Sequence, residues 1–490
     1  MIPVLTKEQA YKLDKDTIES GHLSQEELMD NAGKAVAQFF CEKIKNPFSK
    51  TVVVVCGKGN NGGDGVIAHS YLKKYNVSSK IVFTEENHGH SKLLKKYKIS
   101  KSEFSIYNYK IKFDKYDWVI DGIFGIGLNR CLNEKYIRIV TKLNQNKNII
   151  SIDISSGLFV NSNKSKNFIK SKHVIIFGYP KLGHYLSPLN SLHPSDIGFK
   201  SISSNIQMIE QSDIYNILKT FKKKNNVHKY SRFTNIVAGS IIYPGAAILA
   251  VKAAFKTGSS YITLVLDSND KSFIDKMNLK LDEAIVTGYG PQYAHLEPVP
   301  VLWGPGISFP NDSCIDELDI NSEKFHYEED DFHKQRHVYD AGALYFGLDN
   351  CIDKSILTPH IGELKSIFHL KDDVAIDINL FKLIQQKIRG KIIILKSFNT
   401  FIFSKDHIYI MDRGPSLLST AGTGDVLSGI LVSLLSQGYS RLEASILGTY
   451  LHAEAANYYM NNISRDGMTA SDLIDCIPHA FNELRKENEL

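Results

Sequence analysis

An apolar strand that leads directly into a glycine-rich loop is the feature that most constrains the fold of this chain. Residues 51–56 read Thr-Val-Val-Val-Val-Cys, and such a continuous apolar run suits a strand covered on both faces of a parallel sheet. Residues 57–65 follow with five glycines, two asparagines and one aspartate, and a helix is expected over 66–75. Glycines before a helix let backbone N–H groups approach an anion, so we expect this loop to hold a phosphorylated ligand.

The same loop fits the dinucleotide-binding pattern G-x-G-x-x-G at 57–62, with Glu85 and Glu86 roughly 20 residues further on. A plain dehydrogenase is the weaker interpretation, because the carboxylate of Asp64 would repel the ligand in a pure phosphate cradle. We therefore expect Asn60, Asn61 and Asp64 to supply coordination or chemistry. A tight strand-to-helix turn without any ligand remains the alternative.

The length and the pattern of strands and helices indicate two α/β domains, each with a parallel sheet. The 490 residues exceed what one typical core supports, and a polar, lysine-rich segment at 220–229 is the expected linker. We predict domains at 1–215 and 225–490, and an exposed loop at 288–335. Helices are expected at 244–256 and 425–435, and strands at 52–56, 81–84, 118–121, 149–153, 173–177, 235–238, 261–266, 392–395 and 400–403.

Charge and cysteine spacing exclude several classes of protein. The formal net charge is only +5 and the lysines are scattered, which does not indicate a nucleic-acid partner. The six cysteines contain no C-x-x-C pair, so neither a zinc site nor a disulfide framework is indicated, in keeping with a reducing cytoplasm. No apolar run approaches the roughly 18 residues of a membrane span, and no signal sequence is recognised. We expect a cytoplasmic protein without a membrane partner.

Polar residues follow three of the expected strands in the first half of the chain. Ligands of parallel sheets bind beyond the carboxyl ends of the strands, and the three groups are glycine-flanked. A single aspartate in such a place is commonly a helix cap, but three in order favour a site. Oxygen ligands from Asn61, Asp121 and Ser156 would suit an alkali or alkaline-earth cation, which leaves Asp153 as a candidate acid/base.

Four motifs of this half resemble the NAD(P)H-hydrate epimerase domain over about 1–210. They are Gly-Asn-Asn-Gly-Gly-Asp-Gly (59–65), Asp-Gly-Ile-Phe-Gly-Ile-Gly-Leu (121–128), Asp-Ile-Ser-Ser-Gly (153–157) and Pro-Lys-Leu-Gly (180–183). The resemblance implies a Rossmann-like domain with K⁺ on Asn61, Asp121 and Ser156. It implies catalysis by Asp153 and hydrate contacts from Asn60, Asn61, Gly62, Gly63, Asp64, Gly125, Ile126, Gly127, Leu128, Asn129, Arg130, Cys131, Asp153 and Ser156. The proline usual in the third motif is Ser155 here, which is expected to alter loop stiffness.

The second half carries Ala-Gly-Thr-Gly-Asp at 421–425 before an apolar helix. This segment resembles the anion hole of ribokinase-like kinases. Small residues leave backbone N–H groups free for a transferring phosphoryl group, and Asp425 can take a proton from an attacking hydroxyl. The alternative is an aspartate that only complements the dipole of the helix.

Further motifs in the same order resemble the nucleotide-dependent NAD(P)H-hydrate dehydratase domain over about 225–490. They are His228-Lys229, Gly239-Ser240, 243–247, 304–306, Asp340-Ala341, 358–363, and Leu395-Lys396 with Thr400. The resemblance implies that Asp425 is the catalytic base. It places Ala246, Gly306, His360 and Asp425 near the hydrate, and Lys396, Ser397, Phe398, Asn399, Thr400 and Gly424 on the adenine nucleotide.

This half departs from the family pattern at several positions. Gly342 stands where a second aspartate is usual, and Ser397 and Phe398 stand where glycine and a small residue are expected. A phenylalanine in the nucleotide loop could obstruct the ligand or stack on its base. The remaining departures are Tyr230 and Ser231 after His-Lys, Ile361 after Pro-His, and residues 415–418.

The two resemblances together imply a fused enzyme that repairs hydrated NADH and NADPH. The first domain would interconvert the R and S hydrates at C6, and the second would dehydrate the S hydrate with ADP or ATP. K⁺ and the nucleotide are the expected cofactors, Mg²⁺ is a further candidate, and a homo-oligomer is expected. Two alternatives remain: a ribokinase-like kinase of a vitamin-precursor alcohol fused to a binding domain, and a non-catalytic scaffold.

Overall fold

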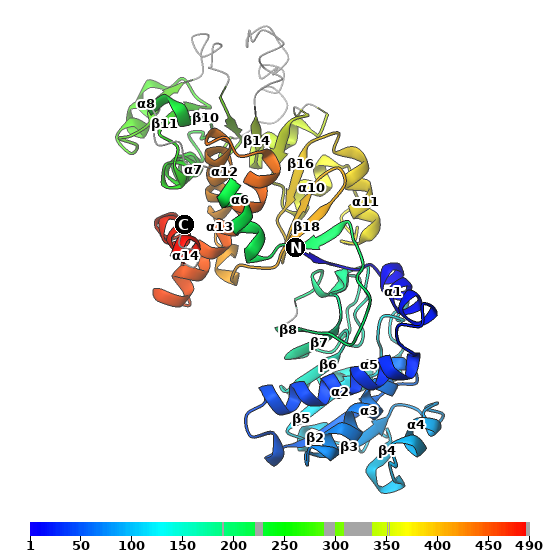
Figure 1. Ribbon diagram of the computed structural model, residues 1–490. Helices are drawn as coiled ribbons and strands as arrows, with labels where there is room; N and C mark the ends of the chain where they lie inside the picture. The colour runs from blue at the N-terminus through cyan, green and yellow to red at the C-terminus, as the bar shows by residue number, and fades with distance from the viewer. Residues whose placement is uncertain are drawn as a thin grey trace. The chain divides into compact units, whose positions relative to one another are not determined.

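A computed structural model describes residues 1–188, 191–220, 229–288, 299–307, 336–349, 351 and 353–486. The chain forms two compact units (Figure 1), one of residues 2–206 with 375–381 and the other of Met1, 207–374 and 382–490. Most of the expected linker at 220–229 lies outside the described residues. No helix within the described part of the chain combines the length and the apolar character that crossing a membrane requires.

The N-terminal unit contains a parallel sheet with the strand order β4-β3-β2-β5-β6-β7-β8. The five strands that the sequence predicts are all present. Two edge strands, β4 and β8, were not predicted, because they are short and only partly buried and so lack an apolar run. The bounds are β2 (Thr51–Cys56), β3 (Ser78–Phe83), β4 (Phe104–Ile106), β5 (Trp118–Gly122), β6 (Ile149–Ile152), β7 (His173–Phe177) and β8 (Ser191–Ser195).

Helices cover both faces of this sheet (Figure 1). On one face α2 (Gln25–Lys43) and α3 (Asn60–Lys74) share a core with alternate residues of β2 and β5, whereas α5 (Glu134–Leu143) covers the other face. Capping boxes at Thr6 and Ser24, both recognisable in the sequence, begin α1 (Lys7–Glu19) and α2. The short helix α4 (Ser91–Lys96) follows β3.

The glycine-rich segment differs from the expected loop, because α3 begins at Asn60 rather than at residue 66. Two of its glycines illustrate a requirement of packing. A Cβ on Gly62 would lie 2.0 Å from the carbonyl oxygen of Gly57, and one on Gly65 would lie 2.8 Å from Sγ of Cys56. The poor helix propensity of glycine concealed these first turns in the sequence. Close contact between α3 and β2 therefore accounts for much of the motif.

The C-terminal unit contains a sheet with the order β18-β17-β16-β15-β14-β13-β10-β11-β12. In this order, neighbouring strands from β12 to β16 are parallel, and β17 and β18 extend the sheet by antiparallel pairing. The strands are β10 (Phe233–Val237), β11 (Tyr261–Leu266), β12 (Ile285–Gly288), β13 (Val301–Trp303), β14 (His337–Tyr339), β15 (Ser355–Leu357), β16 (Ile392–Leu395), β17 (Thr400–Phe403) and β18 (Ile408–Met411). Two further short strands are β1 (Ile2–Pro3) and β9 (Ile206–Met208).

The prediction of an exposed loop at 288–335 is wrong for residues 301–303, which form β13. Val301, Leu302 and Trp303 are all buried in the middle of the sheet. Three residues between Pro300 and Gly304 form too short a run to reveal a strand, and β14 and β15 were missed for the same reason. Most of the remaining stretch, 289–298 and 308–335, lies outside the described residues.

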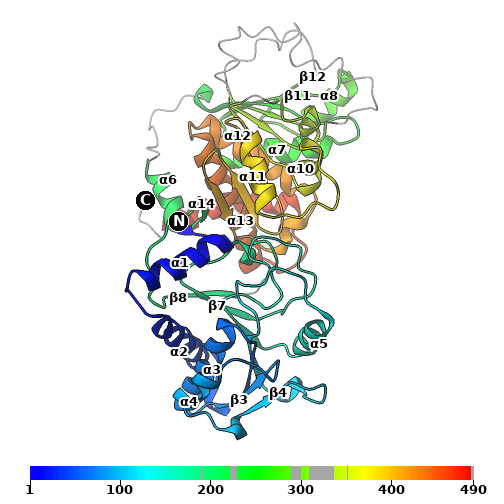
Figure 2. The same cartoon turned by 90° about the vertical axis from the view of Figure 1, so that its right-hand side faces the viewer.

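Four helices, α7, α12, α13 and α14, form the apolar layer on one face of this sheet (Figures 1 and 2). The packing is close, since a Cβ on Gly429 would lie 2.3 Å from the carbonyl oxygen of Ala250. Ile214 of α6 belongs to the same core. The bounds are α6 (Gln211–Thr220), α7 (Pro244–Thr257), α8 (Lys271–Asn278), α10 (Ile361–Ile367), α11 (Ile378–Lys387), α12 (Thr423–Ser436), α13 (Arg441–Asn462) and α14 (Ala470–Lys486).

Candidate active sites

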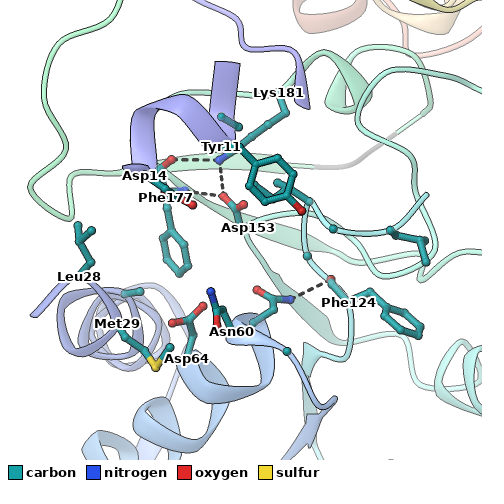
Figure 3. A pocket seen from close by; sticks show the side chains of 18 of the residues that line it. Tyr11, Asp14, Leu28, Met29, Asn60, Asp64, Phe124, Asp153, Phe177 and Lys181 are labelled. Carbon is teal, nitrogen blue, oxygen red and sulfur yellow. Dashed lines mark hydrogen bonds and ion pairs between the residues drawn. The ribbon is translucent and has the colours of Figure 1, made fainter. Parts of the chain in front are cut away.

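A cavity of about 780 Å³ opens at the carboxyl ends of β2, β5 and β6 (Figure 3). Its wall is built from α1, α2, the start of α3 and the loop after β5. The predicted site residues on this wall are Asn60, Asn61, Asp64, Gly125, Ile126, Gly127, Leu128, Asn129, Arg130 and Asp153. Gly62, Gly63, Cys131 and Ser156 do not line it.

Asp121 lies beneath this cavity in a buried network of hydrogen bonds. Ser156 donates to its carboxylate from the hydroxyl at 2.6 Å and from the backbone N–H at 2.9 Å, and the Ser151 hydroxyl donates at 2.8 Å. Burial raises the pKa of Asp121, and these hydrogen bonds oppose the shift. No cationic side chain of the described residues forms an ion pair with this carboxylate. Asp121 therefore has hydrogen-bond donors around it but no compensating charge.

The three predicted potassium ligands meet at one place. The Ser156 hydroxyl lies 3.2 Å from the carbonyl oxygen of Phe124, and Nδ2 of Asn61 donates to that carbonyl at 2.9 Å. The group thus gathers a carboxylate, a hydroxyl and a carbonyl oxygen, together with the Asn61 amide, whose nitrogen rather than oxygen makes the contact with Phe124. Oxygen donors of this kind suit a hard cation. The described residues contain no cluster of His, Cys, Asp and Glu that could hold a transition metal. The residues present fit a potassium ion.

Asp153 is held firmly at the end of β6. Its φ of 61° is unusual for a residue with a side chain, and such conformations persist only where surrounding contacts fix them. Nζ of Lys181 lies 2.5 Å from Oδ1, and the backbone N–H of Phe177 donates to the same oxygen at 3.1 Å. His184, whose pKa burial lowers to about 4, lies 2.9 Å from the Asp153 carbonyl oxygen. The Asp153 carboxylate is therefore paired with a buried cation.

Two further carboxyl groups enter the cavity. Burial raises the pKa of Asp64 well above its usual value, and the charges of Asp153 and Asp14 raise it further. Burial also raises the pKa of Asp14 to about 6, assisted by Asp153 and opposed by Lys181. Sequence reasoning did not single out Asp14 or Lys181 as site residues. Lys181 could have been found from the sequence, because it belongs to the Pro-Lys-Leu-Gly motif. Asp14 lies on one side of α1 with Tyr11, Lys15 and Ile18, and all four line the cavity.

The second group of candidate residues lies at the carboxyl edge of the C-terminal sheet. Asp425 occupies the first turn of α12, directly after Gly422, whose φ is 89°. Nζ of Lys396, after β16, lies 2.9 Å from Oδ1 of Asp340, after β14. The hydroxyl of Thr358 donates to the same oxygen at 2.7 Å. The residues that follow three parallel strands therefore meet beside the start of α12.

The charges at this edge set the properties of Asp425. Burial raises its pKa to about 7, and Asp340 contributes in the same direction while Lys396 opposes. Burial disfavours the charged form of Lys396, but the charges of Asp340, Glu363 and Asp425 outweigh it and raise the lysine pKa. A carboxyl group with a pKa near neutrality can both accept and release a proton under working conditions.

The other predicted residues of this half take several positions. Ala246 and Gly306 are adjacent, since a Cβ on Gly306 would lie 3.0 Å from that of Ala246. His360 caps α10, with its Nδ1 accepting from the N–H groups of Gly362 and Glu363. Gly424 lies beside Nζ of Lys396. The nucleotide segment forms the turn between β16 and β17, which contains Ser397, Phe398 and Asn399 and leads into Thr400.

Three features of this edge were not assigned from the sequence. Asp340 and Thr358 were recognised as motif residues without a role, and His452 was not noticed because it lies mid-helix. His452 contacts the Thr423 carbonyl at 2.8 Å, and burial lowers its pKa to about 4. A Cβ on Gly342 would lie 2.6 Å from the carbonyl oxygen of Ile307. The space at this position therefore suits the glycine of this chain rather than the aspartate that is usual in the family. His228 lies outside the described residues.

Comparisons with known proteins agree with this architecture. A family model described as NAD(P)H-hydrate dehydratase matches residues 234–479, and one described as YjeF-related protein N-terminus matches 25–183. The chain is 29% identical over 521 residues to the bifunctional NAD(P)H-hydrate repair enzyme Nnr of Dictyoglomus turgidum, covering 94% of this chain and 95% of that one. The enzyme of the same name from Thermofilum pendens is 26% identical over 527 residues, covering 97% and 96%. A solved structure, the ADP/ATP-dependent NAD(P)H-hydrate dehydratase of Bacillus subtilis, covers 58% of this chain and 100% of that one with a TM-score of 0.46 and 22% identity.

The matched dehydratase model extends over half of the chain. The chain belongs to the NAD(P)H-hydrate dehydratase family, and its N-terminal unit carries the YjeF-related domain. Both resemblances found in the sequence are confirmed, and the predicted fold class of two α/β domains, each with a largely parallel sheet, is confirmed as well.

The ion pair at Asp153 gives a prediction about stability. Lys181→Met should lower the free energy of unfolding of the N-terminal unit by about 3–5 kcal/mol, because it leaves a buried carboxylate without its cation. The double variant Lys181→Met with Asp153→Asn removes the charge and should recover most of that loss. Urea unfolding, with hydrogen exchange at the amides of β6 and β7 to locate the change, measures both. Equal instability of the single and the double variant would contradict the ion-pair account.

Proposed function

We propose that this chain repairs hydrated NADH and NADPH with two separate sites. The N-terminal site would interconvert the R and S hydrates, and the C-terminal site would dehydrate the S hydrate with ADP or ATP. The observation that carries the proposal is that each unit of the chain holds a carboxyl group close to a lysine: Asp153 is paired with Lys181, and Asp425 lies within the electrostatic influence of the Lys396–Asp340 ion pair. Relatives that cover nearly the whole chain are named as bifunctional NAD(P)H-hydrate repair enzymes, which supports both activities.

The epimerisation needs little beyond proton transfer. In the hydrate the C6 hydroxyl shares its carbon with the ring nitrogen, whose lone pair can expel the hydroxyl as water and leave an iminium ion. Addition of water to the other face inverts C6. Asp153, placed on the cavity wall and fixed by Lys181 and Phe177, is our candidate for moving a proton in this exchange. The start of α3 and the loop at 125–130 would hold the nucleotide.

Potassium would be held by the carboxylate of Asp121, the hydroxyl of Ser156 and the amide oxygen of Asn61. A bound cation would supply the positive charge that the buried Asp121 lacks. It would fix the start of α3 against the loop that follows β5, through Asn61 and Phe124. The substrate-binding wall would then depend on the cation for its shape.

The dehydration would proceed through a phosphorylated hydrate. Asp425 takes the proton of the C6 hydroxyl, the hydroxyl oxygen attacks the terminal phosphorus of the nucleotide, and AMP (or ADP) leaves. The ring nitrogen then expels phosphate from C6, and loss of a proton from C5 gives the reduced nucleotide. Lys396 is our candidate to offset the phosphate charge, and the N–H groups at the start of α12 would bind the transferring group. The fused architecture favours ADP in our reading.

The alternatives weighed from the sequence are less favoured. A kinase of a vitamin-precursor alcohol would need no second domain with a carboxylate-lined cavity. A scaffold would need neither that cavity nor an Asp425 whose pKa burial raises to about 7 near Lys396. Assembly as a homo-oligomer and a cytoplasmic location stay predictions.

The division into two sites can be tested at Asp425. Asp425→Asn keeps the size but removes the base, so dehydration of pure S hydrate should fall by about 10²–10⁴-fold while epimerisation persists. Wild-type dehydration should rise with pH through about 7, because only the ionised carboxylate accepts a proton. Both activities are measured in Asp425→Asn and in Asp153→Asn, which should show the reverse pattern. Dehydration at the wild-type rate in Asp425→Asn would refute the mechanism, and loss of both activities would refute the division.

The potassium site gives a separate prediction. Replacing K⁺ by a bulky organic cation, or changing Asp121→Ala, should slow epimerisation and weaken nucleotide binding to the N-terminal cavity. Dehydration of pure S hydrate by Asp121→Ala should remain unchanged and shows that the chain is folded. Undiminished epimerisation under both treatments would rule out the site.

A further inference from the structure

Inversion at C6 needs two proton movements that one carboxylate is poorly placed to perform. The hydroxyl must gain a proton to leave as water, and the incoming water must lose one. Asp153 contacts the buried cation of Lys181, and the proposed function assigns it the role of proton acceptor. A second group that carries a proton at working pH is therefore required in the cavity.

We propose that Asp14 of α1 is this second group and donates the proton to the departing C6 hydroxyl. The inference rests on the proposed epimerase function of the N-terminal unit. Asp14 lines the same cavity as Asp153 but comes from a different element, since Asp14 belongs to α1 and Asp153 follows β6 (Figure 3).

The contacts of α1 fix Asp14 in place. Ala10, Leu13 and Thr17 bury one face of the helix, and Leu13 and Ala10 pack with Leu5. The backbone N–H of Lys7 donates to Oδ1 of Asn161 at 2.9 Å. This anchoring leaves the stripe that contains Asp14 facing the cavity.

α1 also contacts the loop at 125–130, which the family resemblance assigns to the substrate. Nζ of Lys7 lies 3.3 Å from the carbonyl oxygen of Gly127, and a Cβ on Gly127 would lie 3.3 Å from the hydroxyl of Tyr11. A nicotinamide ring bound by this loop would therefore lie close to α1. Asp14 is placed on the side of the helix that such a ring would meet.

The charges around Asp14 suit the role of a donor. Asp153 and Lys181 act on it in opposite directions, Asp64 faces it across the cavity, and Lys15, Lys58 and Arg130 are further charged residues on the wall. Burial raises the Asp14 pKa to about 6, so roughly a tenth of this group keeps its proton at pH 7. Burial also raises the pKa of Asp64, and the charges of Asp153 and Asp14 act in the same direction.

The step balances as follows. Asp14 transfers its proton to the C6 hydroxyl, the C6–O bond breaks, and the nitrogen lone pair forms the C6–N double bond. Water adds to C6 from the other face, its electrons return the double-bond pair to nitrogen, and Asp153 takes its proton. Asp14 is then ionised and Asp153 protonated, which is the form that runs the opposite epimerisation. Proton exchange with solvent interconverts the two forms.

The test compares Asp14→Asn with Asp16→Asn, an exposed aspartate on the same helix. Asp14→Asn keeps the shape but cannot donate an acidic proton, so kcat for epimerisation should fall by about 10²–10⁴-fold with little change in KM. Wild-type kcat should fall as pH rises through about 6, because the donor loses its proton, and this pH limb should be absent in Asp14→Asn. Asp16→Asn should match wild type. Asp14→Glu, which restores a proton donor, should recover part of the rate.

The outcomes separate the failure of this inference from failure of the proposed function. Wild-type kcat in Asp14→Asn, or an unchanged pH limb, would overturn the role of Asp14 while the epimerase function stands. A rise in KM alone would show that Asp14 only binds substrate, and would also overturn the role. No epimerisation by the wild-type chain, with dehydration of the S hydrate intact, would instead overturn the epimerase function on which the inference rests.

Discussion

The carboxyl ends of parallel strands meet at one edge of a sheet, and both candidate sites depend on this constraint. At the end of a strand, backbone groups and short polar side chains have no hydrogen-bond partners in the sheet. Because several strands end at the same edge, such groups come together from residues far apart in the sequence. In the first unit β2, β5 and β6 deliver Asn61, Asp121 and Asp153 to one edge. In the second unit β14, β15 and β16 bring Asp340, Thr358 and Lys396 together beside the start of α12.

Burial at these edges distinguishes the carboxylates from one another. Asp121 is surrounded by hydrogen-bond donors, Asp153 is paired with Lys181, and Asp425 stands between a lysine and another aspartate. Desolvation raises the pKa of Asp121 and of Asp425, and the neighbouring groups oppose or add to that shift. In the proposed function one residue type thereby serves three tasks: Asp121 is a cation ligand, Asp153 accepts a proton in epimerisation, and Asp425 is the base of dehydration.

The sequence predicts the elements that carry long apolar runs and misses those that do not. The sequence shows the strands at 51–56 and 261–266 and the capping boxes of α1 and α2. Apolar runs and capping residues depend only on neighbouring residues in the sequence, so they can be recognised without the fold. The start of α3 and the three-residue strands β13, β14 and β15 were not, since tertiary packing stabilises glycine-rich helix turns and short buried strands. Motif residues were located by their spacing. Asp14 and Lys181 reach the cavity only through the fold, so their approach to Asp153 could not be predicted.

The central claim is that one chain carries a hydrate through two successive reactions at separate sites. The most direct measurement is to give the purified chain pure R hydrate with and without ADP, and to follow the absorbance of the reduced nicotinamide together with released phosphate. We expect conversion of R to S without ADP, and full regeneration of the reduced nucleotide with one phosphate per hydrate when ADP is present. Persistence of the R hydrate under conditions in which the S hydrate is consumed would contradict the claim.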